Sequence, residues 1–136
     1  MNGLYGIGFH HIALNVSDID RSVAFYTEGL GFRVYRSWTN AGSGTRAAMI
    51  DFGNGCLELF GGAKQGEITT PAGAYPHFAF AVEDVQAAYD HAIAAGAKPK
   101  KEPSDVTVPS EVPLNITIAF VYGPDGEQIE FFKENR

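Results

Sequence analysis

Two histidines open the two copies of a repeated phrase in this 136-residue chain. The first copy is His11-Ile-Ala-Leu-Asn-Val-Ser-Asp18, and the second is His77-Phe-Ala-Phe-Ala-Val-Glu-Asp84. The same interval separates the two histidines and the two aspartates, so the copies align without a gap. An imidazole can ligate a metal ion, transfer a proton or serve as a hydrogen-bonding group. The duplication therefore offers two equivalent imidazoles for one kind of chemistry.

Each histidine is followed further along the chain by a glutamate in the middle of an apolar strand pattern. Glu58 lies in Cys56-Leu-Glu-Leu-Phe60, and Glu130 lies in Gln128-Ile-Glu-Phe-Phe132. Side chains alternate between the two faces of a strand, so the flanking apolar residues share one face and the glutamate takes the other. The same alternation places each histidine opposite the apolar face of its own strand. Each half of the chain is thus predicted to present one imidazole and one carboxylate inward.

A divalent cation accounts for these four side chains together. An ionised carboxylate inside a small domain is costly unless something pairs with it, and no Lys or Arg occupies the predicted inward strand positions. A lone strand histidine is more often structural and a lone strand glutamate more often solvated, so the hypothesis depends on the duplicated pattern. Two carboxylates would neutralise the ion, and two imidazoles would complete a mixed nitrogen and oxygen donor set. The predicted metal ligands are His11, Glu58, His77 and Glu130.

The elements that must position these side chains follow the same order in both halves. Asp18 and Asp84 are predicted helix N-caps after the first strand of each half. The first half contains a strand from His11, a helix over 19–29 and strands over 32–38, 47–52 and 56–60; the second contains a strand over 77–82, a helix from 85 that stops at Gly96, a poorly marked strand near 98–102, and strands over 116–122 and 128–132. The fold class is therefore predicted as α+β. We expect a single domain over 1–136 of two βαβββ modules, about 8–61 and 76–133 with a linker over 62–75, forming an open curved sheet around the metal site.

Composition excludes several classes of function. A formal net charge of −6, with no basic run, argues against nucleic acid as a partner. Cys56 is the sole cysteine, so no intrachain disulfide can form, and a lone thiol fits a reducing compartment. The apolar stretches have strand length, far below the ~20 residues that span a bilayer. With no signal-peptide pattern at the start, we expect a cytoplasmic protein that contacts no membrane.

Several other residues are assigned less chemical roles. The stretch from Pro99 to Pro113 holds four prolines and is predicted to be an irregular loop with a lid or mouth role. Lys98, Lys100 and Lys101 cluster at its start and are expected to be solvated. His10 is expected to point away from His11, and His91 to lie on the surface of the second helix; the partnerless Cys56 is assigned to packing.

This combination resembles the vicinal oxygen chelate superfamily, over nearly the whole chain from about His10 to Phe132. The matching phrases are the first copy continued through Ile-Asp-Arg-Ser-Val-Ala-Phe-Tyr26, then Leu30-Gly-Phe32, the second copy, and Pro124-Asp-Gly126 leading to Ile129-Glu130. The resemblance implies paired βαβββ modules that form an open barrel around a metal, commonly as a homodimer. In many members the two halves of one site come from different subunits.

Within the superfamily, the ligand pattern resembles that of bacterial-type glyoxalase I, which uses His, Glu, His and Glu where this chain has His11, Glu58, His77 and Glu130. The resemblance implies a lyase that isomerises the hemithioacetal of an α-ketoaldehyde and a thiol through a metal-bound enediolate. Glu130 would be the base, and Glu58 a ligand and catalytic partner. The bacterial-type site favours nickel or cobalt, and the donor set alone also permits zinc, manganese or iron.

Two departures from glyoxalase I keep other functions open. Asn15 stands where an arginine typically binds the glutathione carboxylate, and Phe60-Gly-Gly62 follows the second ligand where a polar Asn is common. One alternative is a metal-dependent epimerase, other lyase or dioxygenase of the same superfamily. Another is a metal-free module that binds a small hydrophobic molecule, with a cavity lined by Trp38, Tyr35, Phe60 and Tyr75.

Overall fold

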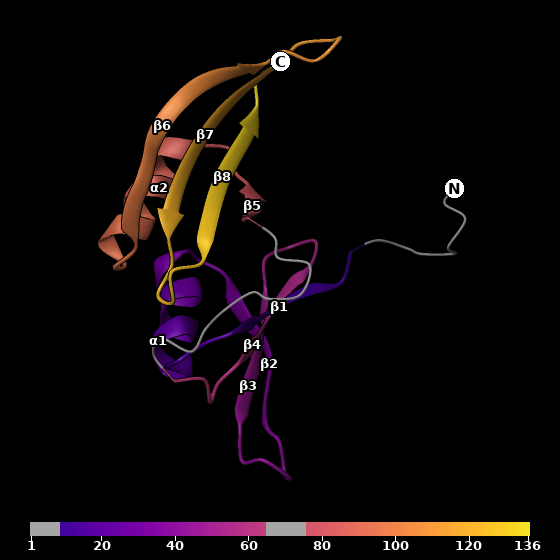
Figure 1. Ribbon diagram of the computed structural model, residues 1–136, viewed down its shortest axis with the longest axis vertical. Helices are drawn as coiled ribbons and strands as arrows, with labels where there is room; N and C mark the ends of the chain where they lie inside the picture. Colours follow the sequence, from indigo (N-terminus) through magenta and orange to yellow (C-terminus); the bar gives the residue numbers. More distant parts are fainter. Residues whose placement is uncertain (1–8, 65–75) are drawn as a thin grey trace, which may run out of the picture.

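The computed structural model describes residues 9–64 and 76–136, which form two four-stranded sheets, each accompanied by helix (Figure 1). The first module contains β1 (His11–Asn15), α1 (Ile19–Ala24), the π-helix η1 (Phe25–Gly29), β2 (Arg33–Thr39), β3 (Arg46–Asp51) and β4 (Cys56–Phe60). The second contains β5 (Phe78–Ala81), α2 (Val85–Ala94), β6 (Lys98–Val108), β7 (Leu114–Tyr122) and β8 (Gln128–Glu134). Most of the expected linker over 62–75 lies outside the described residues.

The two sheets have the same topology. Their strand orders are β1-β4-β3-β2 and β5-β8-β7-β6. In each sheet the first strand pairs in parallel with the last, and the other neighbours are antiparallel. The predicted α+β class and the repeated βαβββ order are therefore confirmed, with both sheets open. None of the helices in the described ranges is long and apolar enough to cross a membrane.

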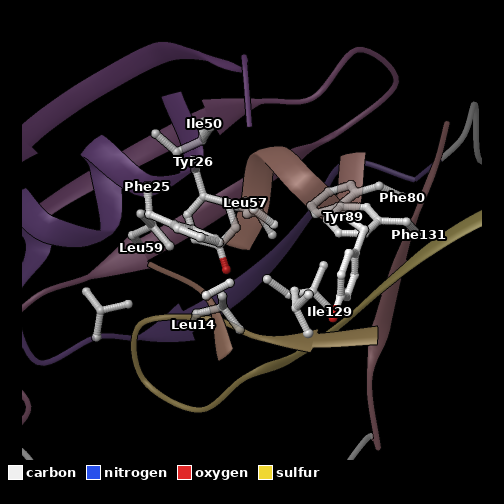
Figure 2. Close-up of a cluster of buried hydrophobic side chains, with 14 of the residues drawn as sticks. Leu14, Phe25, Tyr26, Ile50, Leu57, Leu59, Phe80, Tyr89, Ile129 and Phe131 are labelled. Carbon is white, nitrogen blue, oxygen red and sulfur yellow. The ribbon is translucent and has the colours of Figure 1, made fainter. Parts of the chain in front are cut away.

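The apolar strand faces build the hydrophobic core that alternation predicted. Leu57 and Leu59 are fully buried on one side of Glu58, and Ile129 and Phe131 are buried on one side of Glu130. These side chains belong to one cluster that contains residues from both modules (Figure 2). Burying one strand face in this way leaves the opposite face, with the histidines and glutamates, for chemistry.

Both predicted N-caps form. The Asp18 carboxylate accepts the Arg21 backbone N–H at 3.1 Å, and the Asp84 carboxylate accepts the Ala87 backbone N–H at 2.9 Å. Each bond satisfies a helix amide that has no partner within the helix itself. Because the caps directly follow β1 and β5, they fix where each strand ends and its helix begins.

The first helix ends in a π turn instead of continuing as a regular α-helix. The Leu30 N–H donates to the Phe25 carbonyl, five residues back, at 3.0 Å. A π turn is wider than an α turn, and here the adjacent Phe25 and Tyr26 are both buried. A regular helix with a 3.6-residue period directs adjacent side chains away from each other, so the wider turn helps to bury both rings.

Polar bonds and close packing join the two modules. The Ser17 N–H donates to the Asp125 carboxylate at 3.2 Å, and the Tyr26 hydroxyl donates to the Glu127 carboxylate at 2.8 Å. Gly29 approaches α2 so closely that a Cβ built there would lie 2.5 Å from the Ala95 Cβ. The end of η1 therefore requires glycine, and the turn between β7 and β8 is tied to the first module by polar bonds.

The predicted loop over 99–113 is wrong for most of its length. β6 runs from Lys98 to Val108 and pairs antiparallel with β7, with register shifts on both sides of Lys101. Proline removes a backbone donor, but an edge strand interrupted by bulges tolerates it because one side of the strand has no partner. Pro99 and Pro103 therefore lie in the irregular edge strand of this sheet.

Candidate metal centre

The first pair of predicted ligands lies on neighbouring parallel strands. His11 begins β1, and Glu58 is in the middle of β4, where it pairs with Ala13. The His11 Nε2 and the Glu58 Oε1 are 3.4 Å apart. The His11 side chain is 39% exposed and the Glu58 side chain 15% exposed, so the pair is open to solvent on one side.

The second pair repeats this arrangement in the other sheet. His77 lies just before β5, and Glu130 in β8 pairs with Ala79. The His77 Nε2 and the Glu130 Oε1 are 3.1 Å apart. The Glu130 side chain is more buried than that of Glu58, at 9% exposed.

Aromatic packing and burial shape the environment of the second pair. The Phe120 ring meets the His77 ring edge to face, with 5.2 Å between centroids. Burial raises the pKa of the Glu130 carboxyl, while the His77 imidazole and the Lys101 ammonium act in the opposite direction. Glu130 is thus a carboxylate whose surroundings disfavour its charge unless a cation is near.

The spacing within each pair suits a shared divalent ion. Two donors that bind one ion at about 2.1 Å each lie about 3.0–3.4 Å apart for coordination angles between octahedral and tetrahedral. The observed separations of 3.4 Å and 3.1 Å fall in this range. Imidazole nitrogen with carboxylate oxygen is also a donor set that zinc, nickel, cobalt, manganese and iron accept.

The four predicted ligands form two pairs and not one quartet in this chain. His11 and Glu58 belong to the first sheet, whereas His77 and Glu130 belong to the second. Within residues 9–64 and 76–136, no three histidine, cysteine or acidic side chains lie close enough together to hold a metal ion. Each module of one chain therefore presents half of the predicted donor set.

His10 is a neighbour of the first pair, and the prediction that it points away from His11 is wrong. The two Nδ1 atoms are 2.8 Å apart, and the rings meet edge to face with 5.1 Å between their centroids. His10 precedes β1, so strand alternation does not govern its direction. Because the Nδ1 of His11 makes this contact, it is the Nε2 of His11 that faces Glu58. In the sequence, the one signal of a contact between these two rings is that His10 and His11 are adjacent.

Two of the aromatic residues expected to line a hydrophobic cavity, Trp38 and Tyr35, border different hollows. Trp38 lies in a hollow of about 550 Å³ between α1 and β2, with Val23 and Arg46. Tyr35 borders a different hollow of about 270 Å³, with His10 and Cys56. The fourth expected residue, at position 75, lies outside the described part of the chain.

Comparison with known proteins establishes the family. A profile of the Glyoxalase/Bleomycin resistance protein/Dioxygenase superfamily matches residues 8–131, which include both His–Glu pairs. The chain belongs to this superfamily. The resemblance inferred from the repeated phrases is therefore confirmed, and the paired βαβββ fold is the fold of the superfamily.

Several relatives within the superfamily carry the name glyoxalase I or lactoylglutathione lyase. A lactoylglutathione lyase from Haemophilus influenzae is 33% identical over 131 residues, covering 90% of each chain. Glyoxalase I from Zea mays has a TM-score of 0.72 and 28% identity, over 92% of this chain and 44% of the maize chain. A trypanothione-dependent glyoxalase I from Leishmania major has a TM-score of 0.67 and 29% identity, over 90% and 84%. These relatives support an enzyme close to glyoxalase I.

Proposed function

We propose that this superfamily member is a glyoxalase I-like metal-dependent lyase that isomerises the hemithioacetal of an α-ketoaldehyde and a thiol. The observation that carries the proposal is the pair of equivalent His–Glu couples, His11 with Glu58 and His77 with Glu130, at 3.4 Å and 3.1 Å. Relatives named lactoylglutathione lyase support the same reaction class. We propose nickel or cobalt as the metal, with zinc, manganese or iron as ions that the same donors accept.

The complete site would form between two copies of the chain in a homodimer. Each described chain supplies one His–Glu pair per sheet, and the pairs do not meet within it. Two-fold symmetry would bring the first pair of one subunit to the second pair of its partner, and it would create two identical sites. Each site would then hold two imidazoles and two carboxylates. The two negative charges of the carboxylates would neutralise the two positive charges of a divalent ion.

The reaction moves one proton between adjacent carbons and one between their oxygens. The hydroxyl-bearing, thiol-substituted carbon of the hemithioacetal loses its proton and the neighbouring ketone carbon gains one. The hydroxyl proton passes to the former ketone oxygen, and a thioester of a 2-hydroxy acid results. When bound, the divalent ion stabilises the negative charge that develops on the two substrate oxygens. Glu130 accepts the proton and returns it to the adjacent carbon, and Glu58 holds the opposite side of the site.

The thiol component is a separate question, because Asn15 stands where glyoxalase I typically has an arginine for glutathione. Asn15 lies on the same strand as His11 and pairs with Phe60 of β4. Its amide can donate and accept hydrogen bonds but carries no charge. We therefore propose testing the hemithioacetals of methylglyoxal with several thiols, glutathione first.

Metal loading and a base variant test the chemistry. Purified protein should bind one divalent ion per chain, and the loaded protein should convert methylglyoxal with a thiol to the thioester. Glu130→Gln, which keeps the shape but removes the base, should abolish exchange of the substrate proton with solvent while the protein stays folded. Retained turnover in Glu130→Gln would rule out this role.

Mixing two inactive variants tests whether the site forms between subunits. His11→Ala breaks the first pair and His77→Ala breaks the second, so each variant alone should be inactive. After unfolding and refolding together, about a quarter of the sites should be intact, because half of the dimers are mixed and each mixed dimer holds one complete site. No recovery of activity, with mixed dimers present, would place both pairs of a site within one subunit.

The same measurements separate the alternatives. Stoichiometric metal without activity on any hemithioacetal would favour an epimerase, another lyase or a dioxygenase of the superfamily. No stoichiometric metal under any loading condition would favour a metal-free binding module.

A further inference from the structure

The hairpin of β6 and β7 is longer than its equivalent in the first module. β6 and β7 contain 11 and 9 residues, whereas β2 and β3 contain 7 and 6. The register of β7 with β8 ends at Ile116, so the pair of Val108 and Leu114 lies beyond the third strand. In Figure 1 this end of the hairpin and the hairpin of β2 and β3 point to opposite ends of the molecule. Residues 105–117 are called the arm below.

One face of the arm is apolar. Val106 pairs with Ile116, and Val108 pairs with Leu114. Directly paired residues project from the same face of a sheet. Alternation along β7 and β8 places Ile116 and Leu114 on the face that carries Glu130. The apolar face of the arm therefore continues the face of the second sheet that carries the predicted metal ligand.

The other face of the arm is polar, and its side chains bond to one another. The Thr117 hydroxyl donates to the Asp105 carboxylate at 2.6 Å, and the Thr107 hydroxyl donates to the Asn115 side-chain oxygen at 2.8 Å. Polar side chains of this kind suit a surface that faces water. The arm is thus amphipathic, and only its apolar face requires cover.

Four of the five large apolar side chains that are exposed in the described ranges lie at two places. Val108 and Val112 of the arm are 37% and 81% exposed. Phe9 and Tyr35 of the first module are 64% and 48% exposed, and both border the hollow of about 270 Å³ beside His10. Apolar surface that a chain leaves open in this way indicates an interaction site.

A second copy of the chain is the partner that fits both places. The proposed dimer brings the face with His77 and Glu130 of one subunit to the face with His11 and Glu58 of its partner. A half-turn about an axis normal to the strands relates two equivalent pairs around one ion, and it reverses the strand direction. The arm lies at the end toward which β5 and β8 run. It therefore meets the end of the partner's first sheet at which β1 begins, next to Phe9 of the partner subunit.

We propose that the arm is an intersubunit contact in which Val108 and Val112 pack on Phe9 and Tyr35 of the partner subunit. This inference rests on the proposed function, because it assumes that the site forms between two subunits. Two-fold symmetry makes the contact reciprocal, so each dimer forms it twice and neither arm stays exposed. The contact lies beside the first His–Glu pair and holds the two faces of the shared site together.

Cross-linking between introduced thiols tests the contact directly. The variant Tyr35→Cys/Val112→Cys is made in a Cys56→Ser background, which leaves no other thiol. It is treated with a short bismaleimide, and the chains are separated under denaturing conditions. The expected product is a covalent dimer. In the matched control Tyr35→Cys/Thr107→Cys the arm thiol moves to the polar face, and this variant and the two single-thiol variants should stay uncross-linked.

The strength of the dimer gives a second measurement. Val108→Asp/Val112→Asp should raise the dimer dissociation constant about 100-fold, or about tenfold for each lost anchor, in analytical ultracentrifugation. Val34→Asp is the matched control, because Val34 is 46% exposed and borders the separate hollow beside α1. Its dissociation constant should equal that of the wild-type protein, and circular dichroism should show that both variants are folded.

The outcomes separate this contact from the lyase assignment. A covalent dimer that forms only in the Tyr35→Cys/Val112→Cys variant supports the contact, even if the protein converts no hemithioacetal. A wild-type dimer without this cross-link, an unchanged dissociation constant in the double Asp variant, or a monomeric wild-type protein overturns the contact. None of these three results bears on the metal and hemithioacetal assays above, which test the lyase reaction.

Discussion

The bond between Tyr26 and Glu127 is expected to be a main polar link between the two modules. Tyr26 is fully buried on η1, and its hydroxyl donates to the Glu127 Oε2 at 2.8 Å. The other carboxylate oxygen of Glu127 accepts the Asp125 backbone N–H at 2.8 Å. Tyr26→Phe removes one donor, keeps the ring, and leaves a partly buried carboxylate oxygen without that donor.

The expected loss follows from these contacts. A hydrogen bond to a charged group contributes about 1.5–3 kcal/mol. With an unfolding entropy of about 2.1 cal/mol/K for each of the 136 residues, this corresponds to a fall in melting temperature of about 5–10 °C. The ring stays buried, so the hydrophobic contribution of Tyr26 should not change.

Thermal unfolding by circular dichroism measures this loss. The protein is kept metal-free and at one concentration, because bound metal and subunit association both shift melting temperatures. Tyr35→Phe is the matched control: Tyr35 is 48% exposed, so its variant should lose no more than about 0.5 kcal/mol. In a Glu127→Gln background the effect of Tyr26→Phe should shrink, because the two residues are coupled. Equal melting temperatures for Tyr26→Phe and Tyr35→Phe would refute the reasoning.

Two further predictions concern the metal and the pH dependence of stability. His10→Ala should weaken Ni²⁺ or Co²⁺ binding about 10- to 100-fold, because its ring contacts the Nδ1 of His11 and orients that ligand; His91→Ala on the exposed side of α2 should not, and a competing chromophoric chelator measures both. The hydrogen bond from the Gly53 backbone N–H lowers the pKa of Asp51 below its usual value, and the Arg33 guanidinium contributes to the same shift. A lowered folded-state pKa stabilises the fold above the unfolded pKa, and this contribution is lost as the pH falls through the folded pKa. Asp51→Asn should therefore lower the melting temperature at about pH 7. As the pH falls to about 3, the melting temperature of this variant should fall less than that of the wild-type protein. Parallel curves of melting temperature against pH for the two proteins would contradict this.

Local patterns predicted most of the fold because their causes are local. Strand alternation placed Leu57 and Leu59 in the core and Glu58 on the other face, as the structure has them. Asp18 and Asp84 cap their helices as predicted, since a cap needs only a side-chain oxygen and a nearby amide. The duplicated phrase predicted the duplicated module for the same reason.

The errors occur where a distant part of the chain decides the local conformation. The prolines predicted a loop where β6 lies, but pairing with β7 makes this segment a strand. Its bulges accommodate residues that have no backbone N–H to donate. The π turn at η1 likewise has no sequence signature. It allows two adjacent aromatic side chains, Phe25 and Tyr26, to reach one core. His10 lies outside the strand whose alternation was used to place it.

The sequence alone determined the donor types and their repetition, since residue identity and spacing are properties of the chain. It also determined the family, through phrases that span both halves. Only the tertiary structure decided that these donors form two His–Glu pairs on separate sheets, because the closeness of residues far apart in the chain depends on strand order and register. The same register brought Lys101 and Glu130 into one row, which no spacing along the chain could have indicated.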